Sequence, residues 1–218
     1  FSPYYSIGGG WLMNNESFIQ NNLPFINELR LRYSFGVVGN SSLAPQDYME
    51  VFNRNSQDLY LGGLCWTLNG FANPNLKQQN TIQHNVGVDL GLFNDRISIQ
   101  FNYYNFLTNN TLTDMNLPIS HGFNAVRGNI GKIRNEGFEW YLNFVLLNSE
   151  AKGIRWNLNA NITRVRNTIV ELSEGFKEAI KGQFREMGTA TDAIKYQEGK
   201  SMDAIYGLRS VGIDPTSG

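Results

Sequence analysis

The sequence predicts an all-β protein of antiparallel strands, and the architecture that it favours is a segment of a transmembrane β-barrel. Three observations predict this fold class: a period of two in hydrophobicity, polar strand faces made mostly of uncharged side chains, and links that alternate between short and long. The composition agrees, because the 218 residues include 28 Asn and 22 Gly, both poor helix formers, and only 17% are charged. A formal net charge of -1 gives no sign of a nucleic-acid partner.

Five segments alternate apolar and polar residues along their whole length, as a strand does and a helix does not. They run from Glu28 to Gly39, Thr81 to Leu92, Ile97 to Tyr104, Phe138 to Leu146 and Ile154 to Thr163. On their apolar faces His84 is the only residue that is not apolar, and we expect it to lie at a membrane interface. Weaker alternation predicts further strands at Tyr4–Leu12, Leu59–Leu68 and Ala204–Ile213.

The links between these strands differ in length. Short turns are expected at Phe93–Arg96 and Leu147–Gly153. Long polar links are expected at Gly39–Asn80, Leu107–Asn135 and Arg164–Asp203, the last with a short helix near Ser173–Lys181. A compact soluble domain seldom carries three such loops at one end, whereas an outer-membrane barrel has short periplasmic turns and long external loops.

Alternation by itself leaves two arrangements open. In a soluble sandwich the apolar faces meet each other, and in a barrel they meet lipid while the polar faces line the lumen. The barrel is favoured because the apolar faces carry no charged residue and aromatic residues gather near the strand ends. Those residues are Phe93 and Trp156 at the short turns, and Tyr103 and Trp140 toward the long links. A soluble carbohydrate-binding sandwich remains the alternative from pattern alone.

The polar faces supply the candidate binding residues, because amides and guanidinium groups can bind sugar hydroxyls or peptide backbones. The lumen-facing candidates are Arg30, Arg32, Asn85, Gln100, Asn102, Asn143, Arg155, Asn157, Asn159 and Asn161. These side chains could equally bond to one another, to water or to a domain that fills the barrel. Aromatic residues of the long links, such as Phe52 and Trp66, could stack on sugars, contact a partner or simply pack within the loops.

Several kinds of chemistry have no support in the sequence. One cysteine, Cys65, excludes an internal disulfide framework, and only two histidines are present. We find no catalytic residue set, no metal site and no cofactor motif, so we expect that the chain is not an enzyme.

Four groups of residues carry recognisable patterns, in chain order. They are Leu29–Asn40 (LRLRYSFGVVGN), Asn73–Lys77 together with Val86–Arg96, Asn129–Glu139 (NIGKIRNEGFE), and Glu198–Gly199 together with Tyr206–Gly207 and Gly212–Gly218. These groups resemble the SusC/RagA family of TonB-linked outer-membrane transporters (TonB-dependent receptors) from Bacteroidetes. Gln78 and Gln79 stand where that family usually has Trp-Glu.

The resemblance implies that residues 1–218 are part of one β-barrel domain and supply about eight strands of a barrel of about 22. A plug domain and the remaining strands would lie outside this sequence. The implied function is import of oligosaccharides or oligopeptides across the outer membrane of a Gram-negative bacterium. The implied partners are a SusD-like surface lipoprotein, the TonB–ExbB–ExbD complex, the glycan or peptide cargo and outer-membrane lipid. A passive porin or a structural outer-membrane barrel is the alternative function.

Overall fold

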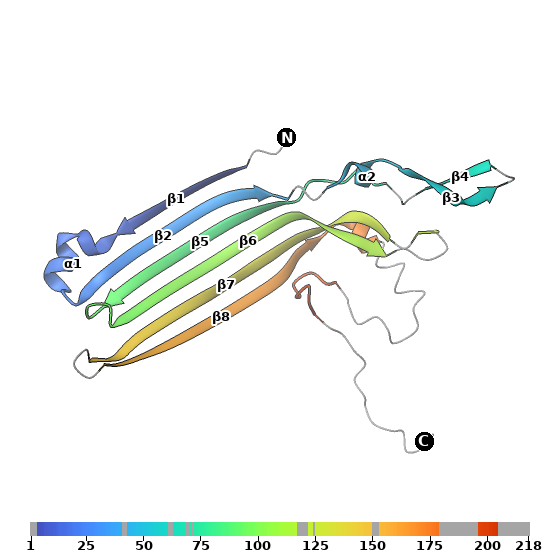
Figure 1. Cartoon of the computed structure of the whole chain (residues 1–218). Coiled ribbons are helices and arrows are strands. Elements are labelled where there is room, and N and C mark those ends of the chain that lie inside the picture. Colours follow the sequence, from blue (N-terminus) through green and yellow to red (C-terminus); the bar gives the residue numbers. More distant parts are fainter. Residues whose placement is uncertain are drawn as a thin grey trace, which may run out of the picture. The chain divides into compact units, whose positions relative to one another are not determined.

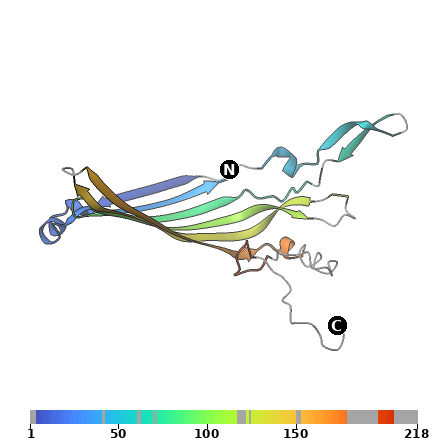
Figure 2. The same cartoon turned by 60° about the horizontal axis from the view of Figure 1, so that its bottom comes forward.

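The computed structural model describes residues 4–40, 43–60, 63–68, 70, 72–116, 122–123, 125–149, 153–178 and 196–204. Six strands form one sheet in the order β1-β2-β5-β6-β7-β8, and β3 pairs with β4 in a separate hairpin (Figure 1). Figure 2 shows the strands of the sheet as a single layer. None of the helices in the described part of the chain is both long enough and apolar enough to cross a membrane.

The bounds of the elements are as follows. The sheet contains β1 (Tyr5–Leu12), β2 (Ile26–Gly39), β5 (Asn80–Leu92), β6 (Ile97–Asn116), β7 (Ala125–Ser149) and β8 (Ile154–Leu172). The hairpin contains β3 (Phe52–Tyr60) and β4 (Gly63–Leu68). The helical elements are η1 (Met13–Asn15), α1 (Ser17–Asn22), α2 (Pro45–Tyr48) and residues 174–178.

The chain divides into two compact units. The first contains Phe1–Leu43, Gln78–Thr111 and Lys132–Asn167, and the second contains Ala44–Lys77, Leu112–Gly131 and Thr168–Gly218. The first unit holds the alternating strands. The second holds the hairpin and buries Leu76, Ile130, Ile169, Leu172 and Phe176.

The register of the first unit confirms the predicted alternation. Directly opposed residues of antiparallel strands point to the same face. Tyr33 lies opposite Val86, which in turn lies opposite Tyr103, so this row belongs to the apolar face. One residue along, Arg32 lies opposite Gly87, which lies opposite Asn102, and this row belongs to the polar face. We call these the outer and the inner face of the sheet.

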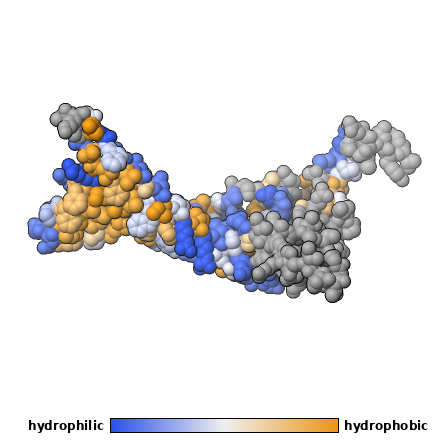
Figure 3. All heavy atoms as spheres, turned by 90° about the horizontal axis from the view of Figure 1, so that it is seen from below, coloured by the Kyte–Doolittle hydropathy of each residue, from blue (hydrophilic) through white to orange (hydrophobic). Residues whose placement is uncertain are grey.

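The outer face is apolar but exposed, because no second layer of the described residues covers it. Ile7 is 69% exposed and Trp156 is 58% exposed, values far above those of a soluble protein core. In Figure 3 apolar side chains gather over the half of the view that contains the short turns. This pattern is that of a barrel wall whose outer face meets lipid, so the predicted barrel segment is present, as an open sheet.

The predicted turn at Phe93–Arg96 is confirmed. Phe93, Asn94 and Asp95 have φ angles of 56°, 56° and 59°, a left-handed run that Asn and Asp tolerate better than most residues. Asn27 of β2 secures this turn, because its Oδ1 accepts a hydrogen bond from the Asn94 backbone N–H at 2.7 Å and its Nδ2 donates to Asn94 Oδ1 at 3.1 Å.

Several predicted links are shorter than expected. The strands β6 and β7 extend through most of Leu107–Asn135, and β8 extends into the beginning of Arg164–Asp203, as far as Leu172, although the alternation had assigned both segments to loops. Of the predicted strand Leu59–Leu68, residues 63–68 form β4, and Leu59 and Tyr60 belong to its hairpin partner β3. The expected helix near Ser173–Lys181 is present over residues 174–178. The predicted strand Ala204–Ile213 lies outside the described residues, apart from Ala204.

Candidate functional site

The centre of the inner face is a hydrogen-bonded group around Arg32. Its Nε and Nη2 donate to the two carboxylate oxygens of Asp89 on β5, each at 2.8 Å, and Nη2 also donates to Asn102 Oδ1 on β6 at 3.0 Å. The Asp89 side chain is 12% exposed and the Arg32 side chain 43% exposed. A two-pronged contact of this kind fixes the guanidinium in one orientation, so Arg32 connects three strands.

Gly87 makes this arrangement possible. It lies between Arg32 and Asn102 in the same cross-strand row. A Cβ atom at this position would lie 2.8 Å from Arg32 Nη2 and 3.0 Å from Asn102 Oδ1. The guanidinium therefore crosses β5 directly over a residue that has no side chain, and any other residue would push it away.

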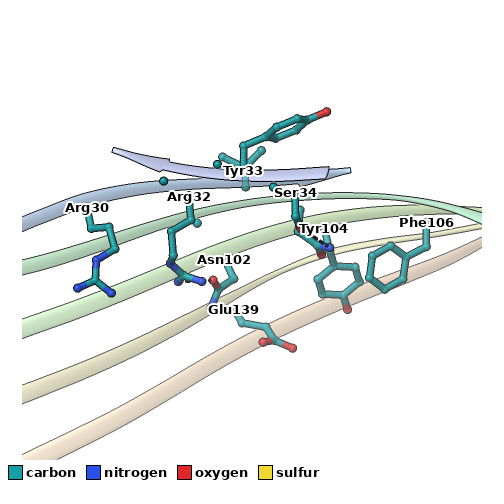
Figure 4. Close-up of a pocket in the computed structure, with 14 residues that line it drawn as sticks. Arg30, Arg32, Tyr33, Ser34, Asn102, Tyr104, Phe106 and Glu139 are labelled. Carbon is teal, nitrogen blue, oxygen red and sulfur yellow. Dashed lines mark hydrogen bonds between the residues drawn. The ribbon is translucent and has the colours of Figure 1, made fainter. Parts of the chain in front are cut away.

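A hollow lies beside this group on the inner face (Figure 4). Gly8 and Gly10 of β1 contribute only backbone to its lining, which leaves open space next to the arginines of β2. Arg30 belongs to the lining and pairs with Glu28 of its own strand at 3.0 Å. Both of these side chains are well exposed, so the ion pair contributes little to stability. Arg30 is therefore accessible and can bind a ligand.

Aromatic side chains form the other wall of the hollow. Tyr104 and Phe106 are successive inner-face residues of β6 with ring centroids 5.1 Å apart. The ring of Tyr104 lies over Gly137 of β7, where an added Cβ would be 2.6 Å from the tyrosine hydroxyl. Asn85 of β5 donates to Ser34 Oγ at 3.3 Å, and both residues line the same hollow.

The other predicted candidates lie farther along the sheet. Gln100 of β6 is exposed on the inner face, opposite Asp89. Asn143 of β7 is partly buried, and its Oδ1 has no hydrogen-bond partner among the described residues. On β8, exposed positions are occupied by Arg155, Asn157, Asn159 and Asn161. The structure thus brings Arg30, Arg32, Asn85 and Asn102 together around the hollow, and leaves the rest outside its lining.

Other residues of this site were missing from the sequence-based candidates. Asp89, Tyr104 and Glu139 all fall on polar positions of the alternating strands, which was the available signal. Their importance depends on the pairing of strands that are far apart in sequence. Arg32 and Asp89, for example, are separated by 57 positions.

Tyr33 and His84 form a polar contact within the apolar part of the outer face. The hydroxyl of Tyr33 lies 3.0 Å from Nδ1 of His84 in the neighbouring strand β5. Figure 4 shows the Tyr33 side chain pointing to the opposite side of the sheet from Arg30 and Arg32. His84 is exposed and packs against Phe35, with ring centroids 4.9 Å apart. His84 therefore lies on the exposed outer face, and its location at a membrane interface stays a prediction.

In the second unit, the Asn-Pro segment that precedes β5 is fastened to β7. Asn73 Nδ2 donates to the Arg127 backbone oxygen at 3.1 Å. Asn129 forms two hydrogen bonds with the backbone of Lys77, accepting from its N–H and donating to its C=O, both at 2.8 Å. The side-chain amide of Asn129 thereby forms the two backbone hydrogen bonds that a neighbouring strand would form with Lys77. Leu76, which precedes Lys77 in the sequence, is buried.

A second fastening joins residues 196–204 to β8. The Ile169 N–H donates to the Lys200 oxygen at 2.9 Å, and the Gly199 N–H donates to the Ile169 oxygen at 2.8 Å. Gly199 has a φ of 80°, which favours glycine at this turn.

Glu198 completes this fastening through its side chain. Its Oε1 accepts from the Leu172 N–H at 2.9 Å and lies 3.1 Å from Lys177 Nζ. The hydrogen bond from Leu172, and then that from Lys177, lower the pKa of Glu198 below its ordinary 4.5. Hydrogen bonds to Glu174 and then to Glu198 raise the pKa of Lys177 above its ordinary 10.5.

The described part of the chain contains no group of three or more His, Cys, Asp or Glu side chains that could hold a metal ion. The side chains of the inner face can bind a ligand reversibly through hydrogen bonds, charges and aromatic surfaces.

Comparison with known proteins agrees with this geometry. Residues 4–196 match the family model described as TonB dependent receptor-like, beta-barrel. The chain is 29% identical over 214 residues to TonB-dependent receptor P39 of Formosa agariphila, covering 94% of this chain and 18% of that protein. It is 28% identical over 222 residues to TonB-dependent receptor SusC of Bacteroides thetaiotaomicron, covering 97% of this chain and 22% of that protein.

A solved structure, the RagAB peptide transporter, matches with a TM-score of 0.69 and 26% identity over 79% of this chain and 18% of that chain. The chain therefore spans about a fifth of the length of the curated relatives that it matches. With a family model that covers all of its described strands, this chain belongs to the TonB-dependent receptor β-barrel family, within which it resembles SusC and the RagAB transporter.

Proposed function

We propose that this chain forms part of the wall of an outer-membrane importer that is driven through TonB. The single observation that carries the proposal is the two-faced sheet, with an exposed apolar outer face and a polar inner face that contains a hollow. In the proposal, residues 1–218 are part of one β-barrel domain of about 22 strands, filled by a plug domain. No covalent chemistry is assigned to the chain.

The dimensions of the outer face support a membrane location. The alternation on β5 runs from Ile82 to Leu92, which is about 34 Å along the strand at about 3.4 Å per residue. A strand tilt of about 40° reduces this to about 26 Å along the membrane normal, close to the apolar band of about 25 Å of outer-membrane barrels.

The proposed cargo is an oligosaccharide or an oligopeptide. Both kinds of molecule carry hydrogen-bond donors and acceptors that the inner face can bind. Arg30, Asn85 and Glu139 can bind hydroxyl groups or backbone amides. Tyr104 and Phe106 add aromatic surface, on which a sugar ring or an apolar side chain can stack. The similar RagAB structure is that of a peptide transporter.

The proposed partners are a SusD-like surface lipoprotein outside the cell and the TonB–ExbB–ExbD complex inside it. The β3–β4 hairpin is a candidate contact for the lipoprotein. Phe52 lies opposite Leu68 and Arg54 opposite Trp66, so these residues share one face of the hairpin. Phe52 is 54% exposed and Trp66 64% exposed. Exposed aromatic residues beside an arginine are typical of protein-binding surfaces.

Uptake by whole cells tests the function. Cells that lack the gene for the complete protein should lose uptake of one class of labelled oligopeptides or oligosaccharides, and the gene should restore it. Removal of TonB should abolish the same uptake, because an energised importer needs the coupling protein. Uptake that persists without TonB would contradict the proposal and indicate a passive porin.

Purification of the complete protein tests the lipoprotein partner. Tagged protein should bring a surface lipoprotein with it from detergent extracts of the native cells. Trp66→Ala should reduce the recovered lipoprotein several-fold, because large aromatic residues dominate such interfaces. Thr67→Ala, on the opposite face of β4, is the matched control and should leave recovery unchanged. Equal recovery with both variants would remove the hairpin from the interface.

A further inference from the structure

We propose that the outer face holds a binding site for the phosphate headgroup of a membrane lipid, formed by His84, Tyr33 and Asn105. This inference rests on the proposed outer-membrane location. It concerns the lipid side of the wall, whereas the proposed transport concerns the lumen side.

The three residues lie together on the same face of three neighbouring strands. His84 of β5 is directly opposite Asn105 of β6, so both side chains leave the sheet on the same side. Tyr33 of β2 belongs to the adjacent row, and its hydroxyl reaches His84 Nδ1 at 3.0 Å. These three side chains interrupt a stretch of the outer face that is otherwise apolar on β5 between Ile82 and Leu92, and we call this interruption of the apolar surface the notch.

The notch lies inside the apolar band, near its edge on the side of the long loops. His84 lies about 27 Å along β5 from Leu92, the last outer-face residue before the short turn, at about 3.4 Å per residue. A tilt of about 40° places it about 21 Å up an apolar band that is about 25 Å tall. One further apolar row, which contains Ile82, lies above it. The notch is therefore within reach of headgroups of the leaflet on the side of the long loops.

The chemistry of the notch suits an anion. Nδ1 of His84 is occupied by Tyr33, and among the described residues Nε2 has no hydrogen-bond partner. When the Tyr33 hydroxyl donates to Nδ1, the neutral ring carries its proton on Nε2, so that Nε2 and the Asn105 amide can each donate to a phosphate oxygen. The outer face of β2, β5 and β6 carries no carboxylate between Leu29 and Val37, Ile82 and Leu92, or Ile97 and Leu107. Polar groups that face lipid without partners are costly, and a headgroup would satisfy them.

Native mass spectrometry of the complete protein in detergent micelles tests this site. The probe is phosphatidic acid, and the comparison lipid is the diacylglycerol with the same acyl chains, which differs only by the phosphate. Wild-type protein should retain phosphatidic acid and release diacylglycerol. His84→Leu and Tyr33→Phe should each weaken retention about tenfold, the effect expected from losing a hydrogen bond that positions or donates to a charged group.

Tyr103→Phe is the matched control, because Tyr103 occupies the same outer-face row as Tyr33, on the far side of Val86. It should retain phosphatidic acid as the wild type does. Each variant is first checked for the gel-mobility shift on heating that marks a folded barrel, and Tyr33→Phe keeps the test valid if His84→Leu misfolds.

Three results would overturn the proposal: equal retention of both lipids, unchanged retention in Tyr33→Phe, or displacement of the lipid by excess inorganic phosphate, which would indicate a site for free phosphate. Cargo uptake by the same variants should remain at the wild-type level. A failure of this site is therefore distinguishable from a failure of the transport proposal.

Discussion

Gly87→Ala should destabilise the sheet, although alanine is ordinarily the better residue in a strand. The added Cβ would lie 2.8 Å from Arg32 Nη2, 2.9 Å from its Cζ and 3.0 Å from Asn102 Oδ1. The guanidinium must then move away from β5. It would lose its contact with Asn102 and distort the paired contacts with Asp89, which are both 2.8 Å long.

The size of the effect follows from these contacts. A hydrogen bond to a charged group contributes about 1.5–3 kcal/mol when it is well formed. The Arg32 side chain is 43% exposed, so solvent screening reduces the contribution of each bond. Alanine is by itself more favourable than glycine within a strand by roughly 0.5–1 kcal/mol, and this gain offsets part of the loss. The expected net loss is about 1–2 kcal/mol, or roughly 5- to 30-fold in the folding equilibrium constant.

Urea titration of the complete protein, refolded into lipid vesicles, measures this loss. The matched control is Gly9→Ala on β1, where an added Cβ meets nothing within 4 Å and should leave stability unchanged or slightly higher. The effect of Gly87→Ala is also measured in a protein that carries Arg32→Ala. The obstructed side chain is absent there, so the substitution should change the stability very little.

Equal destabilisation by Gly87→Ala with and without Arg32 would refute this explanation. The loss would then arise from the backbone of β5 rather than from the guanidinium above it. Destabilisation of the same size by Gly9→Ala would refute it too, because it would show a general intolerance of the sheet to Gly→Ala.

Three further predictions concern other parts of the chain. Val88→Arg on the outer face should lower folding yield into vesicles and cost about 2–4 kcal/mol, whereas Gln100→Arg on the inner face should fold normally. Asn129→Ala should speed protease cleavage of the segment before β5 several-fold, because two backbone hydrogen bonds are lost; unchanged cleavage would contradict the fastening. The pKa of Glu198 is lowered and the pKa of Lys177 is raised, so both groups are charged and in contact between about pH 4.5 and 10.5. The contact is lost at low pH, when the pH falls through the lowered pKa of Glu198. It is also lost at high pH, when the pH rises through the raised pKa of Lys177. The protection of residues 196–204 against hydrogen exchange, relative to an unfolded chain at the same pH, should fall outside that window in wild-type protein, and Glu198→Gln should show the lower protection already at pH 7.

The sequence was most informative where two different solvents meet the two sides of a strand. Between Ile82 and Leu92 every second residue except His84 is apolar, as expected for a strand with one side toward lipid, and both the strand and its faces could be predicted. Beyond Phe106 the same backbone continues to Asn116, but most of the residues are polar on both sides and the apolar ones no longer alternate. Pairing of the backbone does not need alternation, and the periodicity ended before the strand did.

The inner-face site could be predicted as a set of residues but not as an arrangement. Alternation alone placed Arg32 and Asn102 on the same face. Which carboxylate Arg32 would bind depended on the register between β2 and β5, which the sequence pattern does not contain. The role of Gly87 was hidden for the same reason, because its missing side chain matters only once Arg32 lies across it.

The two fastenings in the second unit bear on how chains of this kind should be compared. Asn73, Asn129 and Glu198 belong to the segments by which the chain resembles its family, and each uses polar side-chain atoms on the backbone of its own chain. Such residues hold the chain's own segments together. Two barrels can share this signature and carry unrelated nutrients, so a classification by cargo should weigh the lining of the hollow, from Arg30 to Glu139, above the residues that make the family easy to find.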